Sequence, residues 1–237
     1  MTGTPYTPSQ LGVRPAPALV QHLLVGAFGW MFAGLLLSAG VAYLVATSPT
    51  LLTTVSQWWL LIVIGQLALV FAIQATLTRA TPLVSLALFF VYAATMGLTL
   101  GVIIWTFSQT PDGVAAVATA FLSASAMFGA AALYGAVAKR DLTAMGGILF
   151  MGLIGLLVAM LVNIFLGSPQ VAWLISIVGV VLFTALTAYD VQRIARGDYA
   201  AITGSPERGS IVGALRLYLD FINLFLFLLR LFAGGRN

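Results

Sequence analysis

The sequence contains no cysteine and a single histidine among its 237 residues. Without cysteine the chain has no disulfides, no thiolate metal sites and no cysteine nucleophile, and one histidine excludes a metal site built from several histidines. Charged residues are also scarce, at 7% of the chain, whereas a soluble domain carries about 25%. Because 61% of the residues are hydrophobic, most of the surface must face an apolar phase, which predicts a membrane protein.

The balance of charge is basic, with ten Lys and Arg against six Asp and Glu and a net charge of +4. In a soluble protein this balance would be typical of nucleic-acid binding. Here the basic residues fall in short segments between apolar runs, where positive charge orients a membrane protein. We therefore expect a lipid bilayer as the surroundings of this chain and no nucleic-acid partner.

Seven apolar runs are long enough to cross a bilayer as helices of about 20 residues. The breaks between them contain turn residues such as Ser48-Pro49 and Gly167-Ser168-Pro169. Barrel strands would be about 10 residues long with alternating polarity, a pattern that these runs lack. The fold class is therefore predicted to be an all-α polytopic membrane protein. The predicted spans are residues 19–46, 58–78, 82–107, 114–138, 142–166, 171–195 and 211–232.

The spans are expected to form one transmembrane domain, residues 19–233, between two short tails. Residues 1–18 hold four prolines among small polar residues, a composition typical of a disordered segment. The first apolar run is longer than the ~7–15 residues of a signal-peptide core, so we interpret it as a retained span. Residues 234–237 form the predicted C-terminal tail.

Basic residues gather on one side of this topology. If the N-terminus is cytoplasmic, the loops after the second, fourth and sixth spans face the cytoplasm and contain all of the loop Lys and Arg, which predicts this orientation. Arg230 and Arg236 near the C-terminus oppose an external end, so a re-entrant last segment is the alternative. The basic loop residues are Arg79, Lys139, Arg140, Arg193, Arg196 and Arg208.

One carboxylate lies deep within the last predicted span. Asp220 follows Ile211 by nine residues, about 14 Å along a helix and near the middle of the bilayer. A charged side chain there costs about 2.5–3.5 kcal/mol on insertion scales and usually faces a bundle interior. Arg216, Asp220 and Asn223 follow helical spacing and form a polar stripe, so we expect the last span inside the bundle. The alternative is an Asp220–Arg216 pair that only stabilises packing.

A second carboxylate, Asp190, lies in the same half of the membrane as Asp220, and Arg79 ends the second span at this level. Two carboxylates that approach closely share a proton and titrate as a pair. An Arg79 side chain paired with either would form a latch that protonation weakens. Carboxylate oxygens are also preferred by Ca²⁺, so Asp190 and Asp220 are candidate calcium ligands. These residues predict a pH-gated cation path.

Five motifs in the same order resemble the Bax inhibitor-1 family across roughly residues 20–232. The two long motifs are TALTAYDVQR at residues 184–193 and LYLDFINLFLFLLRL at residues 217–231. The three short motifs cover residues 96–100, 139–142 and 161–165. The resemblance implies six helices around a central C-terminal seventh, in a bacterial inner membrane.

The resemblance also implies a function, because bacterial members of that family are described as pH-sensitive calcium leak channels. Asp190 and Asp220 match its paired aspartates, which form the pH sensor. Arg79 falls where the family has an arginine that latches to the position of Asp190. Calcium would be the permeant ion, with no cofactor. The long connection between Gly197 and Ser210 departs from the family pattern and bears on how the two aspartates are placed.

Two other classes of function compete with a channel. Two intramembrane aspartates are also found in intramembrane aspartyl proteases, but Asp220 follows Leu217-Tyr218-Leu219 in place of the glycines of a Gly-x-Gly-Asp motif. We therefore expect no enzyme. A non-transporting regulator that binds a membrane protease or another membrane protein stays open as the alternative.

Overall fold

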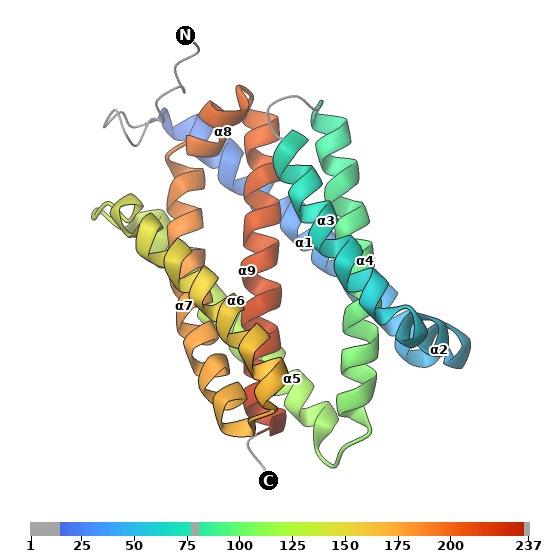
Figure 1. The fold of residues 1–237 in the computed structure, drawn as a ribbon. Helices are drawn as coiled ribbons and strands as arrows, with labels where there is room; N and C mark the ends of the chain where they lie inside the picture. Colours follow the sequence, from blue (N-terminus) through green and yellow to red (C-terminus); the bar gives the residue numbers. More distant parts are fainter. Residues whose placement is uncertain (1–14, 77–80, 235–237) are drawn as a thin grey trace. The chain divides into compact units, whose positions relative to one another are not determined.

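The structure is a computed structural model that describes residues 15–76 and 81–234. Regular structure in these residues is entirely helical (Figure 1), which confirms the all-α class. Arg79 and most of the two predicted tails lie outside the described residues. The elements are α1 (Pro17–Thr47), α2 (Pro49–Gln57), α3 (Trp59–Thr76), α4 (Pro82–Ser108), α5 (Gly113–Val137), η1 (Thr143–Met145), α6 (Gly146–Leu166), α7 (Pro169–Ala195), α8 (Asp198–Thr203) and α9 (Pro206–Gly234).

Local sequence explains where these helices begin and end. Helices α1, α2, α4, α7 and α9 each start with a proline, whose fixed φ suits the first helical position and whose missing N–H is not needed there. The Ser48 and Thr81 hydroxyls accept hydrogen bonds from backbone N–H groups in the first turns of α2 and α4. Gly167 and Gly197 follow α6 and α7 with positive φ, a conformation that glycine adopts without steric cost.

Six helices are long and apolar enough to cross a membrane individually within the described residues, namely α1, α4, α5, α6 with η1, α7 and α9. Helices α2 and α3 pass the same criterion only as a pair, and they are bent by 71° at their junction. The seven predicted spans therefore correspond to six single helices and this bent pair. The last segment, for which a re-entrant form was the alternative, is one continuous helix of 29 residues.

Helix α2 corrects the sequence interpretation, which expected a loop before residue 58. Its threonines point to the reason, because Thr53 and Thr54 donate hydrogen bonds to the carbonyls of Pro49 and Thr50 one turn earlier. The polar side chains are thus satisfied within the helix, and a polar segment that looks like a loop in sequence forms nine helical residues.

The described residues form two compact units, the first from residues 15–76, 81–111 and 194–218 and the second from residues 112–193 and 219–234. In the first unit, α1 packs along α4, and α2 and α3 pack against α4 as well (Figure 1). Two glycines of α4 permit the close approach of α1. A Cβ atom at Gly97 would lie 2.7 Å from the Ser38 carbonyl oxygen, and one at Gly101 would lie 2.8 Å from that of Ala42.

A buried polar cluster joins three helices of the first unit. The Ser38 hydroxyl lies 2.7 Å from the Ala93 carbonyl oxygen and 2.7 Å from the Tyr218 hydroxyl. Because Ser38 has a single hydrogen, Tyr218 donates to Ser38 when Ser38 donates to a carbonyl. The Tyr218 ring meets Phe89 and Tyr92 edge to face. The cluster therefore links α1, α4 and the first half of α9.

The second unit consists of α5, α6, most of α7 and the second half of α9. Phe221 of α9 packs edge to face against Phe121 and Phe128 of α5. Gly135 of α5 lies directly on the Ala188 carbonyl of α7, with no room for a Cβ atom. Among the six single spans of the described residues, helix α9 is the most buried, since 78% of its apolar stretch is buried against 11–44% in the other five. This burial is that of an interior helix, as the sequence predicted for the last span.

Candidate functional site

Both predicted aspartates are buried within apolar spans. Asp190 on α7 and Asp220 on α9 are each only 4% exposed, and both belong to the second unit. Each takes part in an interaction within the protein. A carboxylate that is buried in this way faces neither lipid nor bulk water, and burial of a charge is costly unless the protein compensates it.

Packing between α7 and α9 fixes the register of the two aspartates. The Phe183 and Phe227 rings stack with centroids 5.8 Å apart, and Gly179 lies against the same Phe227 ring. Asp190 follows Phe183 by seven residues and Asp220 precedes Phe227 by seven, about 10 Å or two helical turns in each case. Since consecutive spans run antiparallel, this count places Asp190 and Asp220 at one level, on the helix faces that carry the stacked rings.

A buried glutamine next to this site was missed by the sequence analysis. Gln192 is 3% exposed and accepts a hydrogen bond of 2.8 Å from the Leu142 backbone N–H. Its amide nitrogen donates to the carbonyls of Arg140 at 2.8 Å and Ala138 at 3.3 Å. Gln192 thereby ties the α5–α6 connection to the end of α7. The sequence feature that could have identified Gln192 is its position inside the motif at residues 184–193.

Aromatic and basic residues flank Asp190 on α7. The Arg193 guanidinium lies over the Tyr189 ring, 5.6 Å from its centroid, a distance at which a cation is attracted to an aromatic face. The Tyr189 hydroxyl lies against Gly146, where a Cβ atom would come within 2.6 Å of it. Asp190 therefore sits between the apolar part of α7 and a basic, aromatic end.

Burial of α9 extends beyond the predicted polar stripe, whose central member Asp220 is itself buried. Arg216 and Asn223 are half-buried and Arg230 is exposed, whereas Tyr218 and Leu224, which lie on other faces, are fully buried. The Asn223 amide donates to the Leu219 carbonyl of its own helix at 2.8 Å. Helix α9 is thus buried nearly all round.

The loop carboxylates divide into two kinds. Asp112, Asp141 and Glu207 are exposed. Asp198 is 1% exposed at the start of α8 and engaged in an interaction, so it has a structural place and is not solvated. The reason is the short helix α8, which forms within the long connection and turns Asp198 inward.

Comparisons with known proteins identify the relatives of this chain. Residues 20–237 match the family model described as "Inhibitor of apoptosis-promoting Bax1". An uncharacterized protein of Deinococcus radiodurans is 45% identical over 213 residues, 90% of each chain. The inner membrane protein YbhL of Escherichia coli is 41% identical over 230 residues, 94% of this chain and 96% of YbhL. An uncharacterized membrane protein of Streptococcus pyogenes is 40% identical over 173 residues.

Proposed function

Because the chain belongs to the Bax inhibitor-1 family of integral membrane proteins, we propose that it is a pH-sensitive calcium leak path controlled by Asp190 and Asp220. The observation that supports this function is the burial of both carboxylates at one level on neighbouring helices. The proposed location is a bacterial inner membrane, in line with the relative YbhL. The proposed activity needs neither catalysis nor a cofactor.

The chemistry of the pair explains its proposed sensitivity to pH. Two like charges in a medium of low dielectric cannot both ionise freely, so the pair takes up and releases a shared proton in two coupled steps. An isolated, solvated aspartate ionises near pH 3.9 and stays charged throughout the physiological range. A coupled pair therefore reports changes of cytoplasmic pH that a single exposed aspartate does not register.

Deprotonation acts on the path in two opposite ways. It adds negative charge that attracts Ca²⁺, and it strengthens the hold of the carboxylates on the Arg79 latch proposed from the sequence. Ca²⁺ takes about 6–8 oxygen ligands, of which two carboxylates supply at most four. Such a pair suits brief contact with a passing ion better than permanent binding.

The experiment is calcium flux into liposomes that contain the purified protein, measured across about pH 5–8. Asp190→Asn and Asp220→Asn should each flatten the pH response, because an amide does not titrate in this range. Asp112→Asn is the matched control, since Asp112 is exposed and in the left-handed conformation that asparagine also tolerates. Wild-type pH dependence in both buried-site variants would contradict the paired sensor.

The same measurement separates the channel from the alternative. If the wild-type protein passes no calcium at any pH, the proposed leak path is wrong and the non-transporting regulator becomes the better function.

The proposed cytoplasmic N-terminus has its own test. Because the natural chain has no cysteine, single cysteines placed at Asp112 and at Lys139 should react with an impermeant thiol reagent from opposite sides of the membrane.

A further inference from the structure

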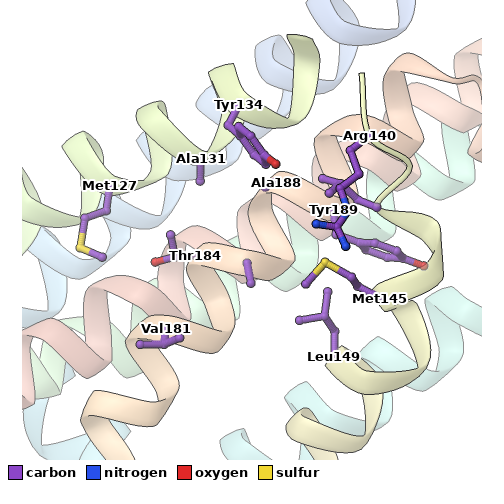
Figure 2. Close-up of a pocket in the computed structure, with 12 residues that line it drawn as sticks. Met127, Ala131, Tyr134, Arg140, Met145, Leu149, Val181, Thr184, Ala188 and Tyr189 are labelled. Atoms are coloured by element: carbon purple, nitrogen blue, oxygen red, sulfur yellow. The ribbon is translucent and has the colours of Figure 1, made fainter. Parts of the chain in front are cut away.

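Helices α5, α6 and α7 and the α5–α6 connection line a groove of about 510 Å³ in the second unit (Figure 2). This volume falls within the roughly 300–1,000 Å³ of typical ligand sites. Most of the lining side chains are apolar, among them Met127, Leu149 and Val181. The proposed leak path makes no use of this groove.

Polar and apolar groups occupy different ends of the groove. Arg140, Tyr134 and Tyr189 lie toward the α5–α6 connection, whereas Met127 and Val181 lie farther along the helices (Figure 2). Eight residues separate Val181 from Tyr189 on α7, about 12 Å of helix. The hydrocarbon core of one leaflet is about 15 Å thick, half of the ~30 Å of a bilayer. The groove therefore matches one leaflet in length and in its gradient of polarity.

The charged end of the groove is held in place before any ligand binds. The backbone carbonyl of Arg140 accepts a hydrogen bond from the buried Gln192 amide, and the neighbouring Leu142 N–H donates to the same side chain. The absence of a side chain at Gly146 leaves room for the Tyr189 hydroxyl. A preformed site loses less conformational entropy on binding.

The groove opens toward the surroundings of the protein. Val181 is 66% exposed and Tyr134 is 53% exposed, and both line it. For a membrane-spanning segment these surroundings are lipid, so the molecules that meet the apolar part of the groove are lipids.

The charge at the polar end selects among lipids. Arg140 lines the groove and its side chain is exposed, with Lys139 beside it in sequence. The neighbouring Asp141 does not line the groove, and its carboxylate accepts hydrogen bonds from the N–H and hydroxyl of Thr143 at 2.9 and 2.7 Å. Basic pockets between transmembrane helices are known to bind anionic lipid headgroups.

We propose that this groove is a binding site for an anionic phospholipid of the leaflet on the side of the α5–α6 connection. Arg140 binds the headgroup phosphate, with the Tyr134 and Tyr189 hydroxyls as neighbouring polar groups. One acyl chain lies along the apolar wall between Leu149 and Val181. The phosphate gains a guanidinium partner, and the chain covers apolar surface between helices.

The test measures lipid binding to the purified protein in detergent by native mass spectrometry. The probes are phosphatidylglycerol and phosphatidylcholine with identical acyl chains, added at equal concentrations. Arg140→Gln should weaken phosphatidylglycerol binding about fivefold. It should weaken phosphatidylcholine binding less, because the choline ammonium already neutralises the charge of that lipid's phosphate. Lys139→Gln is the matched control, because it removes the same charge one residue away from the groove, and it should change binding by less than about twofold.

A second pair of variants tests the apolar part. Ala185→Phe fills the groove from α7, and Val181→Trp does so from an exposed position that tolerates a large side chain. Either variant, once shown to be folded by thermal unfolding, should lose bound phospholipid. Three results would overturn the proposal: equal binding of the two lipids to wild type, equal losses in the Arg140 and Lys139 variants, or full binding by both groove-filled variants.

Discussion

Helices α6 and α9 differ in polarity and in burial. In soluble proteins the more apolar helix is usually the more buried one, and here the opposite holds. Helix α6 is the most apolar span and has one polar side chain, Asn163, yet only 11% of its apolar stretch is buried. Helix α9 contains Arg216, Asp220, Asn223 and Arg230, yet 78% of its stretch is buried. In lipid the surroundings are as apolar as leucine, so a purely apolar helix gains little from burial, whereas polar groups are stabilised inside the protein.

The largest expected effect comes from truncating the same residue type in each helix. Leu224 in α9 is fully buried and Leu161 in α6 is 59% exposed. Leu224→Ala should lower the free energy of unfolding by about 2–4 kcal/mol because it leaves a cavity, while Leu161→Ala should change it by less than about 0.5 kcal/mol. Steric trapping in bicelles measures both. Equal losses would remove the contrast between the helices.

Replacing a glycine by alanine in each helix should change the free energy of unfolding by less than the leucine substitution in α9. A Cβ atom at Gly209 in α9 would lie 2.6 Å from the Ala200 backbone nitrogen, whereas one at Gly155 in α6 would have no atom within 4 Å. Gly209→Ala should therefore destabilise the protein by about 1–3 kcal/mol through overpacking. Gly155→Ala should stabilise it by up to about 1 kcal/mol, because alanine loses less backbone entropy in a helix. The same unfolding assay measures whether the two substitutions change the free energy of unfolding in opposite directions.

A smaller effect is expected from the polar contact of α9 in the first unit. Tyr218→Phe removes the hydroxyl that lies 2.7 Å from Ser38 and keeps the ring against Phe89. Ser38 retains its bonds to the Gly34 and Ala93 carbonyls, so the loss should be about 0.6 kcal/mol, the average for such bonds in membrane proteins. A loss comparable to that of Leu224→Ala would show that the hydroxyl organises the packing of α9.

The smallest effect concerns the one polar residue of α6. The Asn163 side-chain oxygen is buried and has no hydrogen-bond partner among the described residues. Asn163→Leu removes this unsatisfied group, so the free energy of unfolding should stay within about 0.5 kcal/mol of wild type, with any change stabilising. Marked destabilisation would indicate a partner for Asn163 and would weaken the contrast with α9.

The sequence predicted well those features that depend on local composition. The span ends fall within a few residues of prolines and glycines, as at Pro82, Pro169 and Gly167. The burial of Asp220 followed from the cost of a charge in the bilayer. Features that depend on distant partners were missed, because the sequence around Gln192 does not identify the backbone groups of the α5–α6 connection that it binds. Helix α2 was missed because its polar composition resembles a loop, whereas its threonine hydroxyls donate hydrogen bonds to carbonyls of the same helix.

By itself the sequence determined that the chain is a helical membrane protein and which segments can span, because hydropathy and proline placement act within a single helix. It also set Asp190 seven residues from Phe183 and Asp220 seven residues from Phe227. Only the tertiary structure decided that these phenylalanines stack. This stacking sets the level that the two aspartates share. The physical reason is that register between two helices arises from side chains that meet across their interface, and spacing along one helix contains no information about the other.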